Sequence, residues 1–217
     1  MQDYEVVIID FTIKNFRSIK TEQLLSLHAA NKHKLHNNNI AFFDNGIGIL
    51  RSCAIYGANA AGKSNIIKAI DALVYLVERS GSLKDGEAIE CYDPYLLSVE
   101  THKAPIRFEI EFIVAQQRFS YQIEYNQFEI LFEKLDYYPS SRAANLFTRT
   151  SATDFKNVKF GEHYKGGKKQ IGFFANNSYL SKAGNSPESP EIARTVFDFF
   201  RKKIDTLQTH ERVEIAD

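Results

Sequence analysis

The sequence Cys53-Ala54-Ile55-Tyr56-Gly57-Ala58-Asn59-Ala60-Ala61-Gly62-Lys63-Ser64 joins an apolar run to a loop that matches the pattern G-x-x-x-x-G-K-[ST] in full. The run from Leu50 to Tyr56 predicts a short buried β-strand before the loop. From Ser64 onward an amphipathic helix is predicted, because apolar residues recur at intervals of three and four: Ile66, Ile67, Ile70, Leu73, Val74 and Val77. A strand, a glycine-rich loop and a helix in this order predict an α/β unit.

Each fixed position of the loop has a physical role in binding a phosphate group. The glycines permit a turn tight enough for successive backbone N–H groups to surround an anion, and the helix N-terminus adds positive potential. Lys63 would reach the β- and γ-phosphates as the catalytic cation, and the Ser64 hydroxyl would ligate Mg²⁺. The loop therefore predicts ATP and Mg²⁺ as cofactors. The alternative is a glycine-rich turn without a function. The complete match to the motif and the predicted strand and helix on either side of it argue against that alternative.

Hydrolysis of the nucleotide would need a second acidic group at the end of a buried strand. Val6–Asp10 has this form but precedes the loop, so an opening strand with Asp10 facing solvent is the favoured interpretation. Ile130–Asp136 is a weaker candidate because its flanking pattern indicates an antiparallel sheet. No acidic strand is evident after the loop. We therefore expect an ATPase, and keep open a module that binds nucleotide without hydrolysing it.

Alternating apolar and polar residues dominate the rest of the chain. Val6–Ile9, with Phe11 and Ile13, predicts a strand buried on both faces, and Leu24, Leu25 and Leu27 predict a second strand. The alternation over 106–114 and 119–125 predicts an antiparallel hairpin with one solvated face, linked at 116–118. Residues 128–138 predict a further strand, and short strand-like pieces surround 171–174. A closing helix is expected with Ser189 as its N-cap and Pro190 as its first residue.

These elements predict an α/β fold: a P-loop NTPase lobe of mixed sheet and helices that carries an antiparallel β-meander. The whole chain of 217 residues is expected to form one such lobe. The P-loop core covers about residues 1–85, the meander about 104–150 and the closing helical segment about 187–208.

Composition excludes several classes of protein. Lys and Arg number 27 and Asp and Glu number 27, so no net field draws the chain to nucleic acid or to an anionic membrane. A local contact with nucleic acid at Gly166–Lys169 stays open, with a surface basic loop as the default. No apolar run approaches the roughly 20 residues of a membrane span. Two cysteines suit a reducing compartment, so we expect a cytoplasmic protein without a membrane partner.

Several segments together resemble a known family. Phe11–Ile19, with the sequence F-T-I-K-N-F-R-S-I, lies about forty residues before Tyr56–Asn65. This pairing resembles the ABC-type ATPase heads of the SMC and recombination-repair superfamily, and is most similar to the AAA ATPases of the OLD and abortive-infection phage-defence systems. Phe108–Phe112, Asn145–Arg149 and Ser178–Ala183 are similar to segments of the same family.

The resemblance implies further site residues. It places the N-F-R-S segment beside the nucleotide, so Arg17 and Ser18 would contact phosphate or ribose; a solvated charge is the alternative for Arg17. It places Asn59 opposite the γ-phosphate. Asn65 follows the magnesium serine and could equally be a helix-capping residue.

The resemblance also implies how such a lobe works. ATP binding and hydrolysis would drive head association and control an effector, such as a nuclease or toxin, in an anti-phage system. The chain matches the N-terminal lobe of such a head, so the partner would be a second copy or a complementary ATPase lobe. A GTPase or kinase is a weaker interpretation, since no N-K-x-D motif or lid-like arginine cluster is visible.

Overall fold

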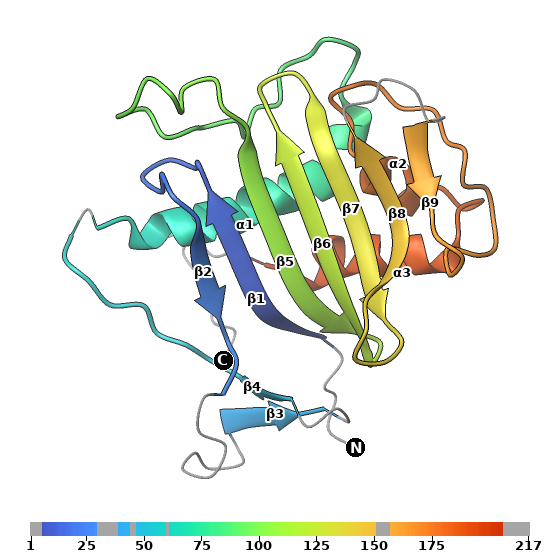
Figure 1. The fold of residues 1–217 in the computed structure, drawn as a ribbon, viewed down its shortest axis with the longest axis horizontal. Helices are drawn as coiled ribbons and strands as arrows, with labels where there is room; N and C mark the ends of the chain where they lie inside the picture. The colour runs from blue at the N-terminus through green and yellow to red at the C-terminus, as the bar shows by residue number, and fades with distance from the viewer. Residues whose placement is uncertain (1–5, 30–38, 44–46, 60, 151–156, 206–217) are drawn as a thin grey trace, which may run out of the picture.

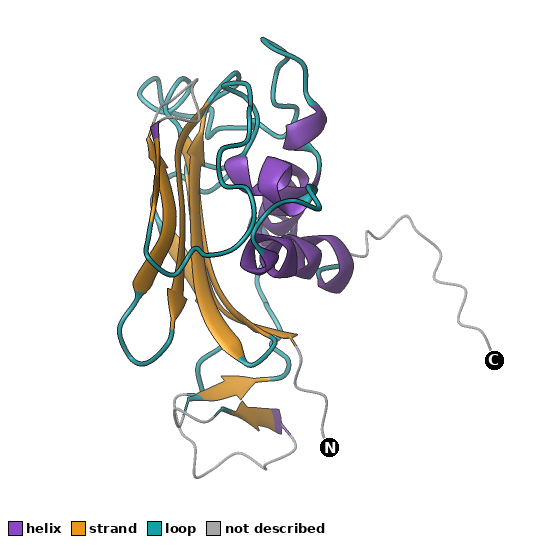
Figure 2. Ribbon diagram, turned by 90° about the vertical axis from the view of Figure 1, so that its right-hand side faces the viewer, coloured by secondary structure: helices purple, strands orange, loops and turns teal. Residues whose placement is uncertain are grey.

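The structure is a computed structural model that describes residues 6–29, 39–43, 47–59, 61–150 and 157–205. Its main element is a seven-stranded sheet with the order β2-β1-β5-β6-β7-β8-β9 (Figure 1). The strands are β1 (Val6–Lys14), β2 (Gln23–Ser26), β5 (Ile106–Val114), β6 (Gln117–Tyr125), β7 (Ile130–Tyr138), β8 (Ala144–Thr150) and β9 (Val158–Phe160). Helices cover one face of the sheet and leave the other face open to solvent (Figure 2).

The predicted hairpin is confirmed as β5 and β6, with Phe108 opposite Ile123. Its inward residues are buried and most of its outward residues are partly exposed polar or charged side chains, as the alternation indicates. Ala115 and Gln116 form the turn with positive φ angles of 49° and 60°. The turn therefore comes one residue earlier than expected, because a two-residue loop with positive φ angles matches the twist of the strands.

The sheet differs from the expected mixed sheet, because every strand pairing in the described ranges is antiparallel. Both β1 and β2 join the meander in one continuous sheet. The expectation that β1 is buried on both faces holds only at its start. A register shift between Ile8 and Asp10 turns Ile9 to the opposite face, where it packs with Ile49 and Ile113. Beyond it, buried and partly exposed residues alternate.

In the described part of the chain, the second layer consists of three α-helices and a short 3₁₀ helix: α1 (Lys63–Glu78), η2 (Ser80–Ser82), α2 (Tyr179–Gly184) and α3 (Glu191–Lys203). The predicted helix after the glycine-rich loop is confirmed as α1, which buries Ala69, Ala72, Leu73, Leu76 and Val77. Phe199 of α3 stacks on Phe112 of β5 with ring centroids 4.1 Å apart. None of the described helices is long and apolar enough to cross a membrane.

Two predictions for the last third are wrong. Helix α3 begins at Glu191 with Pro190 as N-cap, and the buried Ser189 hydroxyl does not cap it. The strand-like pieces at 171–174 are loop. Both errors are local, because a capping pattern fixes a helix start only to within a residue or two and short apolar runs do not specify a strand.

The segment before the glycine-rich loop contradicts the prediction most clearly. A separate hairpin of β3 (Ile40–Phe42) and β4 (Gly48–Leu50) ends at Leu50, so the expected strand Leu50–Tyr56 does not form. Residues 51–56 are exposed, and the side chain of Tyr56 is 89% exposed. In Figure 1 this segment runs outside the β2 edge of the sheet. A strand requires a hydrogen-bonded neighbour along its length. The Arg51 N–H donates to the Asn39 carbonyl at 3.0 Å, but no strand of the described residues pairs with the rest of the segment.

A buried polar network joins the sheet to the helical layer. Glu133 of β7 is fully buried and accepts hydrogen bonds from the Tyr121 hydroxyl at 2.9 Å and from the backbone N–H groups of Tyr179 and Leu180 at 2.7 and 2.9 Å. The guanidinium of Arg149 lies 3.7 Å from its carboxylate. Burial raises the pKa of Glu133, while Arg149 and the backbone donors oppose that shift.

We predict that Arg149→Met destabilises the fold by about 3–5 kcal/mol, because the substitution leaves the buried Glu133 carboxylate without its counter-charge. Urea unfolding followed by circular dichroism measures the loss. Arg107→Met is the matched control: Arg107 pairs with Glu109 on the solvated face, with about a third of its side chain exposed, and its loss should cost under about 1 kcal/mol. Equal losses in the two variants would contradict a special role for the buried pair.

Candidate functional site

The glycine-rich loop Gly57–Ser64 leads directly into α1, whose first residue is Lys63. The helix has no acidic residue in its first turn and no side-chain cap at its start. Its first backbone N–H groups and its positive N-terminal end are therefore directed into the loop, which is the arrangement that binds anions. Of the predicted loop residues, Ala60 lies outside the described residues. Gly57, Ala58 and Asn59 are exposed.

A glycine is required at position 62 for two reasons: the backbone conformation there and the close approach of a neighbouring side chain. It is the N-cap of α1 with φ of 89°, in the left-handed region that favours glycine. A Cβ atom at this position would lie 2.6 Å from the Ser18 hydroxyl oxygen. Any larger residue would thus strain the loop and displace the segment after β1. The second glycine of the motif therefore allows the Ser18 segment to pack closely against the loop, in addition to the room that it would leave for a phosphate group.

The side chain of Lys63 folds back over the loop. Its Nζ donates hydrogen bonds to the backbone oxygens of Gly57 at 2.8 Å and Ala58 at 2.7 Å. The ammonium group is therefore held at the loop by neutral acceptors. A polyphosphate in the loop would offer the same group charged acceptors, which form hydrogen bonds roughly twice as strong.

Ser64 is the one residue of the motif suited to ligate a metal ion. It is exposed and lines a largely apolar cavity of about 450 Å³ with Cys53 and Ile55. The described residues contain no group of three or more His, Cys, Asp or Glu side chains that could hold a metal ion. The donor set therefore fits Mg²⁺ that is held by one hydroxyl together with phosphate oxygens of a nucleotide, a mode that Mg²⁺ favours over an all-protein cage.

The structure brings Arg17, Ser18 and Asn65 together beside the loop. The Asn65 amide donates to the Ser18 hydroxyl at 2.7 Å, and its oxygen accepts from Arg17 Nε at 3.0 Å. The Arg17 guanidinium also forms an ion pair with Asp93. Asn65 therefore bridges the segment after β1 and the first turn of α1. Its side chain contacts these residues and does not cap the helix, which begins at Lys63 without a side-chain cap.

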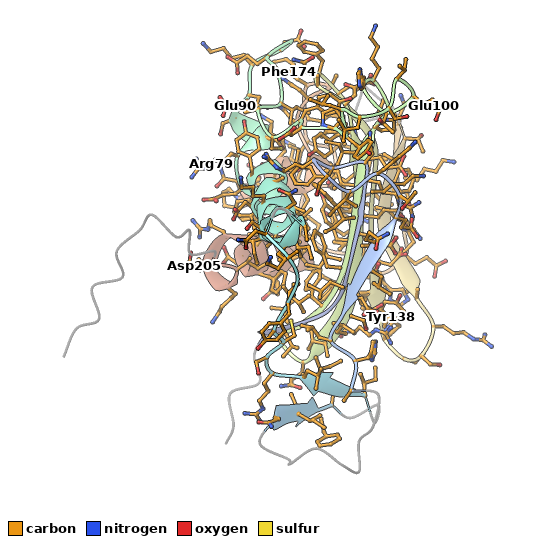
Figure 3. The ribbon with its side chains drawn as sticks, turned by 90° about the vertical axis from the view of Figure 1, so that its left-hand side faces the viewer. Arg79, Glu90, Glu100, Tyr138, Phe174 and Asp205 are labelled. Carbon is orange, nitrogen blue, oxygen red and sulfur yellow. The ribbon has the colours of Figure 1, made fainter. Side chains whose placement is uncertain are left out.

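Two cavities meet at this cluster. A cavity of about 560 Å³ is lined by loop residues Ala61, Gly62 and Lys63, and by residues of the β1–β2 turn, with Tyr56 and Tyr95. Ser18 lines this cavity, whereas Arg17 lines a different one of about 800 Å³ on the outer side of α1. Figure 3 shows Arg79, Glu90 and Asp205 of the second cavity along the outer side of the helical layer. The first cavity adjoins the loop and has the volume of a small-ligand site.

The acidic residues considered for nucleotide hydrolysis do not line the cavities at the glycine-rich loop. Asp10 is on β1 and its carboxylate lies 3.6 Å from His28 Nε2. Asp136 of β7 accepts a hydrogen bond from Asn145 at 2.8 Å, and Glu133 belongs to the buried network. None of the three lines a cavity that contains a P-loop residue. The described residues thus place no acidic strand end at the loop.

The basic loop at Gly166–Lys169 is packed against the chain. The backbone N–H of Lys168 donates to the Glu188 carbonyl at 2.6 Å, and a Cβ at Gly167 would lie 2.3 Å from the same oxygen. The Lys168 ammonium lies 3.5 Å from the Glu188 carboxylate. This arrangement agrees with the surface-loop interpretation and supplies no separate evidence of a nucleic-acid contact.

Sequence reasoning missed Asp93 and Tyr95, and it included Asn15 in the N-F-R-S segment without giving it a role of its own. Asp93 lies 76 residues from its partner Arg17, and no spacing rule links the two positions. Tyr95 lines the cavity beside the loop from a segment without regular structure. Asn15 has a positive φ of 55°, which asparagine tolerates better than most residues, so its type was the one available signal.

A comparison with family models matches residues 53–193, about two thirds of the chain, to the family described as "AAA domain, putative AbiEii toxin, Type IV TA system". No curated protein matches the chain. The matched range begins just before the glycine-rich loop and includes α1, the meander and the start of α3. On this match and the geometry of the loop, the chain belongs to this family of AAA domains, which are P-loop nucleotide-binding ATPases.

Proposed function

We propose that the chain binds Mg-ATP at Gly57–Ser64 and forms one lobe of an ATPase head. The observation that carries the proposal is the start of α1 at Lys63, immediately after a left-handed Gly62, within a complete motif. The loop amides and the helix end would surround the β- and γ-phosphates. Lys63 would exchange its two carbonyl acceptors for phosphate oxygens, and Ser64 would ligate Mg²⁺.

The cavity beside the loop supports a nucleotide over simple inorganic phosphate. It extends from Gly62 and Lys63 to the β1–β2 turn and the start of β2, where Ile19 and Leu24 supply apolar surface, and Tyr95 supplies an aromatic ring. A base and ribose attached to the bound phosphates would lie in this cavity. Ser18 lines it and touches Gly62, so it is placed to contact ribose or phosphate, as the family resemblance implies.

Hydrolysis is proposed for the complete assembly. A non-hydrolysing nucleotide-binding module is the second candidate for the chain alone. It is favoured because Asp10 faces His28, Asp136 faces Asn145, and neither lines a cavity at the loop. Phosphate release by the isolated chain, and then with candidate partner proteins, discriminates between them. Release by the chain alone would contradict the second candidate.

The proposed partner is a complementary ATPase lobe, with a second copy of the chain as the other arrangement. Residues 51–56 support this proposal, because they present an extended, exposed segment just before the loop. Ile55 and Tyr56 are exposed apolar side chains there. A strand from another lobe would satisfy the backbone groups of this segment and bury both side chains.

The biological setting that we propose is anti-phage defence, in which ATP state controls a nuclease or toxin effector. The support is the resemblance to OLD and abortive-infection ATPases and the description of the matched family, which names a putative toxin of a type IV toxin–antitoxin system. Phage-plating efficiency with and without the gene, and with Lys63→Ala, tests this role.

Replacing Lys63 with alanine should weaken ATP binding at least tenfold, because one charged hydrogen-bond donor to phosphate contributes about 1.5–3 kcal/mol. Isothermal titration with Mg-ATP measures the change. Lys68→Ala is the matched control, since Lys68 is an exposed lysine on the same helix that lines the other cavity. Equal affinity of wild type and Lys63→Ala would reject the proposed site.

Cys53 provides a test of partner docking on residues 51–56. It is exposed, so a thiol reagent at pH 8 should modify it in the isolated chain and should modify it far more slowly once a complementary lobe is bound. Cys91 is an internal control, because burial raises the pKa of its thiol to about 12 and leaves little of the reactive thiolate. Unchanged labelling of Cys53 in a verified complex would show that the lobe binds elsewhere.

A further inference from the structure

We propose that Asp93 is a positioning residue that couples the nucleotide site to an exposed apolar loop, residues 93–105, through Arg17. The inference rests on the proposed nucleotide site and adds a surface whose state would depend on occupancy of that site. We call residues 93–105 the apolar loop, because it exposes three large hydrophobic side chains, Leu96, Leu97 and Val99, at 61%, 86% and 89%.

Arg17 connects three segments that are distant in sequence. Its guanidinium forms an ion pair with the Asp93 carboxylate and donates from Nε to Asn65 at 3.0 Å. Its backbone N–H donates to the Asp93 carbonyl at 2.8 Å. The backbone N–H of Asn65 in turn donates to the Gly62 carbonyl at 2.9 Å. One arginine thus links the apolar loop to the first turn of the P-loop helix.

The backbone around Arg17 is held in an unfavourable conformation by these contacts. Asn15 and Arg17 have positive φ angles of 55° and 50°. Such conformations cost about 1 kcal/mol or more for residues other than glycine and persist only where the surroundings impose them. Here the surroundings are the apolar loop itself, whose carbonyls at Thr101, Ala104 and Pro105 accept from the Asn15 amide at 3.1, 2.9 and 3.2 Å.

Hydrogen bonds hold the apolar loop in a defined conformation, although it has no regular secondary structure. The Tyr95 N–H donates to Asn15 Oδ1 at 3.2 Å, and the Thr101 hydroxyl donates to the Tyr95 carbonyl at 2.6 Å. Lys20 of the β1–β2 turn donates to the Ser98 hydroxyl at 3.2 Å. Tyr95 also lines the cavity beside the P-loop. The loop therefore touches the nucleotide site at one end and exposes apolar side chains at its tip.

The nucleotide site and the apolar loop are coupled because Arg17 contacts Asn65 at the first and Asp93 at the second. A polyphosphate that orders Gly62, Lys63 and Asn65 would fix the Asn65 side chain, and with it the guanidinium that holds Asp93. Coupling free energies are reciprocal, so a ligand that stabilises one end of this linkage stabilises the other. An event at the apolar loop, such as docking of an apolar partner surface, would change nucleotide affinity by the same factor.

Hydrogen–deuterium exchange of the full chain, with and without Mg-ATP, tests the proposal. In wild type, nucleotide should slow exchange at the loop 57–64 and also, by about fivefold or more, at backbone amides of residues 95–104. In Asp93→Ala the slowing at 57–64 should remain, while the slowing at 95–104 should be lost. Asp93→Glu, which retains the carboxylate, should restore part of the effect.

Glu100→Gln is the matched control, because it removes a different carboxylate of the same loop. Glu100 is exposed, and Figure 3 shows it on the opposite side of the molecule from Glu90, which lines the same cavity as Arg17 and Asp93. This variant should behave as wild type. Protection at 57–64 without any change at 95–104 in wild type would overturn the coupling and leave the nucleotide site intact. No protection at 57–64 would overturn the proposed function and the coupling together. An identical response of wild type and Asp93→Ala would show that Asp93 has no positioning role.

Discussion

The fold depends on a carboxylate that the sheet presents to its buried face. Glu133 accepts hydrogen bonds from a tyrosine hydroxyl and from two backbone N–H groups at the start of α2, with a guanidinium as counter-ion. The free-energy cost of burying this charge is recovered only if all partners are in place. The network therefore fixes where the segment before α2 meets the sheet, and that segment in turn holds the P-loop helix.

Helix α1 is held at both ends by side-chain hydrogen bonds from distant residues. At its C-terminal end, the Ser178 hydroxyl donates to the Leu76 carbonyl at 3.1 Å, and Asn177 donates to the Ser80 carbonyl of the adjoining η2 at 2.7 Å. At its N-terminal end, Asn65 contacts Arg17 and Ser18. The Leu76 carbonyl near the helix end thereby gains a donor, while the first backbone N–H groups stay without a side-chain cap and face the loop. The helix that presents its N-terminus to phosphate is therefore located by polar contacts at its ends as well as by its apolar face.

The sequence predicted those features that depend on neighbouring residues. The motif, the amphipathic α1 and the β5–β6 hairpin arise from local spacing, and all three are present. The extent of the sheet was missed, because strand pairing between β1 and β5 links residues about a hundred positions apart. The strand before Gly57 was predicted from its apolar residues, yet a strand forms only beside another strand. Asp93 could not be found, since its role arises from contacts that no periodicity encodes.

The exposed segment 51–56 has a consequence for the chain during its synthesis and handling. An extended, exposed stretch that pairs with no strand among the described residues is a template for pairing with any available strand, including the same segment of another molecule. Cells limit such encounters by making binding partners in matched amounts and by chaperone protection of whatever is in excess. If a complementary lobe covers this segment as proposed, the dose of this gene relative to that of the lobe would determine how much of the protein stays usable, because surplus copies would aggregate through the segment that precedes the glycine-rich loop.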